Sequence, residues 1–225
     1  MEKLVYVLFG STPPSPAALA AELGAHGARR IAVNISDGHV AAKLASRITR
    51  LDPTLAAVVS FWLESALDRE RVERTLASAS PRFAGYSVLE SVALANTTHA
   101  AAPSQRTPGI NMIACIAPKT GQAYDAWLEH WLEDHRRVAL ETQATYAYVR
   151  NVVVRALTPG APRWKGIVEE GFAAEAVGDP MLWYKAGGSQ QKLQTNVGRM
   201  IASCQTFLDL DRVESHPMSE YLFER

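Results

Sequence analysis

The fold is decided by a stretch near the middle of the chain, residues 96 to 109, with the sequence NTTHAAAPSQRTPG. It is rich in small and turn-forming residues, contains two prolines and has no apolar period, which is typical of a linker. With residues 100–108 as the linker, the chain divides into a first part, residues 1–99, and a second part, residues 109–225. The two parts can then be compared for an internal repeat.

The first part alternates between strand-like and helix-like segments. Short β-branched and aromatic runs predict strands at residues 4–9, 30–36, 57–63 and 85–92. Helix formers after Ser15-Pro16 predict a first helix, and an amphipathic pattern predicts a second helix over residues 68–79. The resulting order is β-α-β-β-α-β, with a short helix or ordered loop at residues 40–50.

The second part repeats that order. Strands are predicted at residues 110–116, 145–157, 165–172 and 212–222, and helices at residues 124–141 and 179–208. Each part therefore matches a ferredoxin-like unit, whose helices cover only one face of its antiparallel sheet. We expect an α+β fold in which two fused units bury their open sheet faces against each other as a barrel-like pseudodimer.

Composition excludes several classes of function. The 23 Lys+Arg residues balance 23 Asp+Glu residues, and this zero net charge disfavours nucleic acid and anionic membrane surfaces as partners. No apolar run approaches the roughly 20 residues that span a bilayer, and the N-terminus lacks a signal-peptide pattern. The cysteines, Cys115 and Cys204, show no metal or redox spacing. We expect a cytoplasmic protein that binds a small molecule, and pairing with a second copy of itself as a homodimer is left open.

The helix predicted at residues 124–141 carries the main catalytic candidate. At about 100° per residue, Trp127, Trp131 and His135 fall within one apolar stripe, which must face the sheet. An imidazole among indoles is partly desolvated, which keeps it neutral and able to accept a proton near pH 7. The alternative is a structural histidine bonded to a backbone carbonyl in the core. The same face carries no second well-placed histidine, so we expect no metal site.

The strand that follows this helix supplies polar candidates. Alternation places Tyr146, Tyr148 and Arg150 on one face and Asn151 on the other, and the sequence leaves open which face meets His135. Tyr148 or Asn151 could hold a substrate oxygen. Tyr146 and Arg150 are candidates for substrate binding, although tyrosines on strands also serve in packing.

Two more segments carry candidates. Glu169 and Glu170 are adjacent on a strand, so one of the pair points inward if the strand is regular. Glu169 is our candidate for a carboxylate that acts as a base or orients the imidazole, with an exposed edge-strand charge as the alternative. Trp183 could form a wall of an aromatic pocket, or it could belong to helical core.

The second part resembles the EthD family within the dimeric α+β barrel superfamily. The resemblance rests on three features: the strand at residues 112–116, the helix in which Trp127 and Trp131 lead to His135, and the run Tyr148-Val149-Arg150-Asn151. The chain departs from the family's usual His-Ala-Pro-like continuation, since Arg136 and Arg137 follow His135 here. The first part resembles a divergent second copy without an equivalent helix histidine, so one site per chain is expected.

The resemblance implies a cavity between helices and sheet, and a role in catabolism or polyketide-type dehydration. We expect a cofactor-independent lyase (dehydratase) or isomerase that acts on a small aromatic or hydrophobic oxygenated compound through His135. Trp127, Trp131 and Trp183 would line its pocket. Because fold does not fix function, two alternatives stand. One is a non-catalytic accessory protein that binds a hydrophobic ligand. The other is a heme-binding protein or a cofactor-free monooxygenase, as in other members of the superfamily.

Overall fold

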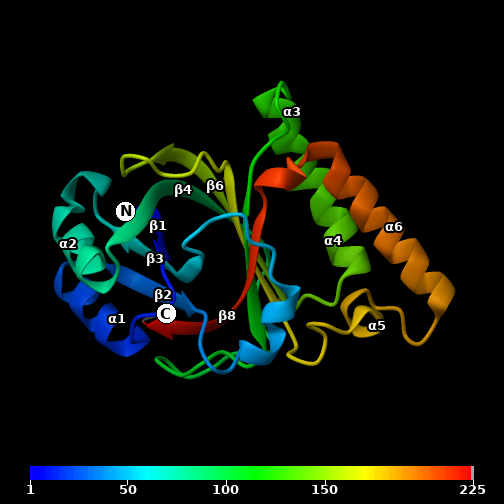
Figure 1. The fold of residues 1–225 in the computed structure, drawn as a ribbon, viewed down its shortest axis with the longest axis horizontal. Coiled ribbons are helices and arrows are strands. Elements are labelled where there is room, and N and C mark those ends of the chain that lie inside the picture. Colours follow the sequence, from blue (N-terminus) through cyan, green and yellow to red (C-terminus); the bar gives the residue numbers. More distant parts are fainter. Residues whose placement is uncertain (224–225) are drawn as a thin grey trace.

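Eight antiparallel strands form one closed barrel in the computed structural model, which describes residues 1–223 (Figure 1). Around the barrel the strand order is β1-β3-β2-β8-β5-β7-β6-β4. The strands are β1 (Glu2–Phe9), β2 (Arg29–Ile35), β3 (Leu55–Leu63), β4 (Arg82–Leu94), β5 (Ile110–Ile116), β6 (Ala147–Ala156), β7 (Gly166–Phe172) and β8 (Glu214–Phe223). The predicted α+β fold, with two antiparallel four-stranded units joined in a barrel, is confirmed.

The two parts of the chain meet along two seams. β2 pairs with β8, and β4 pairs with β6, so each seam joins one strand from each part. The remaining pairings lie within one part. Closure in this way leaves no sheet edge open among the described strands, and it buries the inner faces of both sheets against each other. The assignment of residues 1–99 and 109–225 as two repeats remains a prediction.

Helices cover the outside of the barrel on two opposite sides (Figure 1). Over the first part lie α1 (Pro16–Ala25) and α2 (Glu70–Ala79). Over the second part lie α3 (Tyr124–Glu129), α4 (Arg136–Thr142), α5 (Pro180–Trp183) and α6 (Gln190–Phe207). Short 3₁₀ turns occupy η1 (Ala41–Ser46), η2 (Ala66–Asp68) and η4 (Leu210–Arg212). Within residues 1–223, none of the helices has both the length and the apolar character needed to cross a bilayer.

The helix predicted at residues 124–141 is present but is not uniformly α-helical. Between α3 and α4 it passes through η3 (His130–His135), a π-helical turn. A π-helix bonds residue i to residue i+5, so it brings residues five apart onto one side of the helix. His130 and His135 consequently point toward the same part of α6, where both lie within 3.5 Å of the Ser203 hydroxyl. A uniform rotation of 100° per residue cannot anticipate this alignment.

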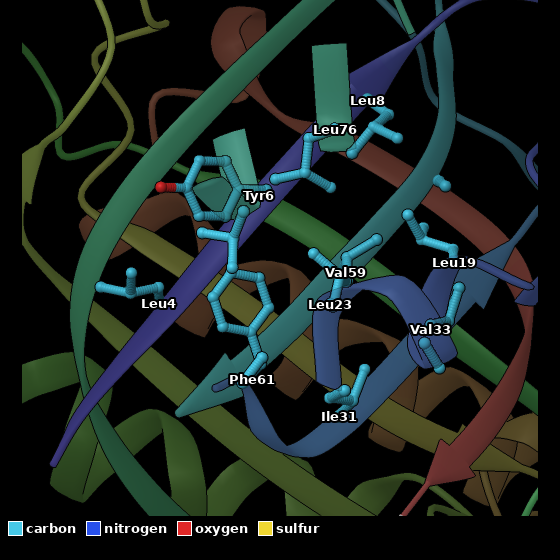
Figure 2. Packing of buried hydrophobic residues seen from close by; sticks show 14 of the residues in the cluster. Leu4, Tyr6, Leu8, Leu19, Leu23, Ile31, Val33, Val59, Phe61 and Leu76 are labelled. Atoms are coloured by element: carbon cyan, nitrogen blue, oxygen red, sulfur yellow. The ribbon is translucent and has the colours of Figure 1, made fainter. Parts of the chain in front are cut away.

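Side-chain alternation sorts the apolar residues into layers. The inward residues of β1, such as Val5 and Val7, belong to a core inside the barrel. The outward residue Tyr6 packs under α1 and α2, where its ring stacks on Phe61 with centroids 5.6 Å apart (Figure 2). Leu23 of α1 is fully buried in the same cluster. Packed side chains therefore fill the helix–sheet interface of the first part.

Candidate active site

A cavity of about 480 Å³ lies at the corresponding helix–sheet interface of the second part. Its sheet wall includes alternate, outward-facing residues: Met112, Ala114 and Ile116 of β5, Tyr148 of β6, Val168 and Glu170 of β7, and Ser215 of β8. Its helix wall includes Trp131 and His135 of η3, and Met200, Cys204 and Phe207 of α6. This is the position that the sequence resemblance implies for a site.

The cavity wall is mostly apolar and carries no fixed positive charge. Among its lining residues within the described chain there are two carboxylates, Glu170 and Asp179, and no lysine or arginine. The Asp179 carboxylate already accepts hydrogen bonds from the backbone N–H groups of Met181 and Leu182 at the start of α5. A buried anion needs a positive partner or several donors, so this cavity suits a neutral, largely apolar ligand.

His135 lines the cavity at the end of the π-helical turn. Its Nδ1 lies 2.9 Å from the Ser203 hydroxyl, and its ring centroid lies 4.7 Å from that of Phe207. Burial, together with the positive charges of His130 and Arg150, lowers the pKa of His135 to about 4. The imidazole is therefore neutral at pH 7. A pKa this low also makes it a weak proton acceptor.

Tyr148 and Glu170 are cross-strand neighbours on the opposite wall. They are directly paired between β6 and β7, which places their Cβ atoms on the order of 5 Å apart on the same face. Burial raises the pKa of Tyr148, so its phenol stays protonated and can donate. The Glu170 side chain lines the cavity and is otherwise enclosed by protein. Desolvation therefore raises its pKa to about 7. A carboxyl group with that pKa can both accept and release a proton at neutral pH.

Asn151 and Glu169 point away from this cavity, into the barrel. The Asn151 Nδ2 donates to Glu169 Oε1 at 2.8 Å, and Glu169 lies 3.7 Å from the Lys3 ammonium. Alternation along β7 therefore sends Glu169 to the barrel interior and Glu170 to the cavity beside His135. The sequence predicts that these two carboxylates face opposite ways, but it cannot say which one accompanies the histidine.

Arg150 and Tyr146 also lie outside the cavity lining. Arg150 is on the same face as Tyr148, but its guanidinium donates to the Leu132 carbonyl and to the Ser91 hydroxyl, each at 2.7 Å. It ties the π-helical turn to the sheet. Tyr146 precedes β6, and its hydroxyl donates to the Pro108 carbonyl beside a different cavity.

The three candidate tryptophans occupy different positions. Trp131 and Trp183 line the cavity, and Trp183 stacks on Phe172 with ring centroids 3.7 Å apart. Trp127 is fully buried and does not line the cavity, although its ring lies 5.1 Å from that of Trp131. The structure thus brings His135, Tyr148, Trp131 and Trp183 together and places Trp127 behind them.

The lining residues that the sequence did not single out as site residues include Glu170, Met200, Cys204 and Phe207. The last three recur at positions i, i+4 and i+7 of α6, a spacing that marks one helix face. That face was detectable in principle, but nothing in the sequence showed that it lies opposite β5.

The raised pKa of Glu170 predicts how stability depends on pH. A carboxyl whose folded pKa exceeds its unfolded value of 4.5 favours the folded state fully below pH 4.5, and loses that contribution as pH rises through 7. We therefore expect Glu170→Gln to be more stable than the wild type at pH 8, with the difference shrinking toward pH 5. Urea unfolding at the two pH values measures this. A difference independent of pH would contradict it.

Comparisons with known proteins establish the fold. No protein-family model matches the sequence, and no curated protein is significantly similar to it. Among solved structures, an anthrone oxidase-like protein superposes with a TM-score of 0.54 at 11% identity, covering 98% of this chain and 93% of that one. It is a dimeric α+β barrel protein, which agrees with the barrel described above. At 11% identity the similarity concerns the fold alone, and the EthD assignment remains a prediction.

Two other structures superpose less closely. A protein proposed to be a monooxygenase, from Lactobacillus acidophilus, has a TM-score of 0.49 at 7% identity and covers 99% of this chain and 95% of its own. A protein proposed to be a chlorite dismutase has a TM-score of 0.44 at 10% identity, with coverage of 100% and 96%.

Proposed function

We propose that the protein catalyses proton transfer at a carbon atom whose C–H bond is acidified by a carbonyl group, directly or through a conjugated ring, in a small, neutral, aromatic or hydrophobic compound. The reaction class is that of a cofactor-independent isomerase or lyase of the dehydratase type. One observation carries the proposal: a desolvated carboxyl group, Glu170, lies beside a buried phenol, Tyr148, in an apolar cavity. The EthD-like pattern around His135 is consistent with the same chemistry.

Glu170 is the proton acceptor in this proposal. With a pKa of about 7 it is half ionised at neutral pH, and its carboxylate is poorly solvated in the apolar cavity. It takes a proton from the substrate carbon, and the electron pair of the C–H bond moves onto the carbonyl oxygen to form an enolate. The protonated carboxyl then returns the proton, either to another carbon in an isomerisation or to a departing hydroxide that leaves as water.

Tyr148 and His135 stabilise the enolate oxygen. The Tyr148 phenol stays protonated and can donate a hydrogen bond to the negative charge that develops on this oxygen. Such a hydrogen bond is stronger in a dry cavity than in water. His135 is neutral, and the Ser203 hydroxyl fixes the orientation of its ring. We assign it hydrogen bonding to the substrate rather than the proton shuttle that its sequence position first suggested.

The lining also limits the class of ligand. Trp131, Trp183 and Phe207 offer flat apolar surfaces, and the volume of about 480 Å³ accommodates a compound of two or three fused rings. Heme carries two propionates, and the described lining residues of this cavity include no lysine or arginine that could pair with them. Heme therefore fits this cavity poorly.

A cofactor-free monooxygenase is the second candidate. The anthrone oxidase-like protein shares the fold, and the enolate of an anthrone can react directly with O₂. That reaction balances as anthrone plus O₂ giving anthraquinone plus water. It needs the same first step, removal of a proton by a base, so the residues assigned above serve both candidates.

Anthrone, a neutral tricyclic ketone with an acidic methylene group, is a suitable probe for both candidate functions, the isomerase or lyase and the monooxygenase. Under argon in D₂O, we expect the protein to accelerate deuterium incorporation at the methylene carbon, observed by NMR. In air, quinone formation with matching O₂ consumption would identify the monooxygenase. Saturable anthrone binding with neither exchange nor oxidation would instead support the non-catalytic binding protein, and it would contradict the proposal.

A further inference from the structure

The inside of the barrel carries a second, polar cavity that is separate from the site above. Each of the eight strands contributes one polar side chain toward the same end of the barrel. In order around the barrel they are Lys3, Ser60, Asn34, Glu220, Asn111, Glu169, Asn151 and Glu90. Six of them are less than a tenth exposed, whereas Glu90 and Glu220 are half-buried. We call these eight residues the polar ring.

Hydrogen bonds and ion pairs connect the polar ring across the strands. On one side, Lys3 forms an ion pair with Glu90 and a second, at 3.7 Å, with Glu169. On the other side, the Asn111 Nδ2 donates to Asn34 Oδ1 at 2.9 Å and to Glu220 Oε1 at 3.3 Å. These bonds hold the side chains around a common space.

That space is a cavity of about 420 Å³. Six members of the polar ring line it: Lys3, Ser60, Glu90, Asn111, Glu169 and Glu220. Trp62 and Tyr146 add aromatic surface, and Arg30 lies at its edge with its guanidinium over the Trp62 ring. Glu170, Tyr148 and His135, to which the proposed function assigns roles, do not line this cavity.

Negative charge exceeds positive charge inside the polar ring. Three carboxylates face one ammonium group, and Lys3 is within ion-pair distance of only two of them, Glu90 and Glu169. Within residues 1–223, Glu220 has no ion pair; its carboxylate accepts from the Thr107 hydroxyl at 2.7 Å and from Asn111. Glu220 is thus the carboxylate of the ring that forms no ion pair among the described residues, and with Arg30 counted the cavity is lined by three carboxylates and two cationic groups.

Two atoms of the polar ring also lack partners. Asn34 Nδ2 and Asn151 Oδ1 have no hydrogen-bond partner among the described residues, although both side chains are at most 1% exposed. Both belong to inward-facing side chains bonded to lining residues. Neither side chain is among the residues that line the cavity, so the two atoms show that the hydrogen bonding of the ring is incomplete behind the lining.

We propose that this cavity binds a small organic cation with primary ammonium groups, such as a linear diamine. An ammonium group would pair with Glu220 and donate to neighbouring oxygens, and Trp62 and Tyr146 would contact its alkyl chain and its charge. A metal ion fits less well, since no group of three His, Cys, Asp or Glu side chains within the described chain has the geometry to hold one. An anion would meet an excess of carboxylates.

The ionisation of Glu220 adds a consequence for the pH dependence. Burial, with a contribution from the charge of Glu169, raises the pKa of Glu220 to about 7, while Thr107 and Lys3 act in the opposite direction. A bound cation favours the ionised carboxylate. Binding of a diamine should therefore be tighter at pH 8 than at pH 6, with proton release near neutral pH.

Putrescine is the probe, with 1,4-butanediol as its uncharged counterpart of the same length. By isothermal titration calorimetry at pH 8, we expect saturable 1:1 binding of putrescine and none of the diol. Glu220→Gln should weaken putrescine binding roughly tenfold or more, since the ammonium group loses a charged hydrogen-bond partner. Glu22→Gln, which removes the same charge from the exposed face of α1, should have no effect.

A second measurement keeps the test decisive should Glu220→Gln fold poorly. In the wild type, the indole N–H NMR signal of Trp62, assigned with Trp62→Phe, should shift on putrescine addition, whereas those of Trp127 and Trp131 should not. The proposal is overturned by an absence of putrescine binding, by equal binding of the diol, or by equal effects of the two Gln variants. None of these results depends on turnover of anthrone at the other cavity.

Discussion

Glu170→Gln should lower the rate of deuterium exchange into anthrone by about 10²–10⁴-fold, the usual contribution of a general base. Gln has the shape of the protonated carboxyl group, so the cavity keeps its volume while the proton acceptor is lost. The effect should appear in kcat more than in KM, because the carboxylate acts on the bond that breaks. NMR-detected exchange under argon measures it.

The pH profile separates a base from a structural carboxyl group. Because the pKa of Glu170 is raised to about 7, wild-type exchange should increase as pH rises through 7, where the carboxylate becomes the dominant form. The residual rate of Glu170→Gln should lack that step. Glu22→Gln, on the exposed face of α1, serves as the matched control and should retain both the rate and the step.

His135 is the alternative to Glu170 as the proton acceptor. If exchange survives in Glu170→Gln but is lost in His135→Gln, the imidazole is the base, and its pKa in the complex is higher than the value of about 4 in the free protein. Loss of stability in His135→Gln, with exchange retained per folded molecule, would instead support a structural histidine. The two variants together assign the proton transfer to one wall of the cavity.

The order of elements was predictable because it depends on local patterns. Strand and helix periods differ, and the turn-rich stretch at residues 100–108 separates two similar runs of elements. The order β-α-β-β-α-β then leaves one sheet face open in each half, and burial of that face favours a barrel. The closed sheet of β1 to β8 follows this reasoning closely.

The site was only partly predictable, because the barrel strand that carries Tyr148 and Asn151 is buried on both faces at these positions. In a sheet with one wet face, polarity distinguishes inside from outside, but here Tyr148 faces a helix and Asn151 faces the barrel interior, and both are buried. For the same reason, the sequence could not show which of Glu169 and Glu170 faces the cavity that His135 lines. The polar ring is also invisible in the sequence, since its members become neighbours only through the strand order of the barrel.

The sequence pattern grouped Trp127 with Trp131 as a substrate-binding residue, whereas the structure predicts a packing role that can be measured. Trp127→Ala should reduce the free energy of unfolding by about 3–5 kcal/mol, the usual cost of deleting a buried aromatic side chain. Trp127 is fully buried, and its indole N–H has no partner within the described chain, so the loss comes from packing rather than from a hydrogen bond. Urea unfolding measures the change.

Trp183→Ala is the matched comparison, because Trp183 is half-buried and lines the cavity. It should cost less stability than Trp127→Ala but weaken anthrone binding, since it removes one aromatic wall. Trp127→Phe, which keeps most of the buried volume, should bind anthrone as the wild type does. A Trp127→Ala protein of wild-type stability that has lost anthrone binding would place Trp127 at the ligand. A Trp127→Ala protein that is less stable but still binds anthrone would show that Trp127 packs behind Trp131 and keeps the cavity wall in position.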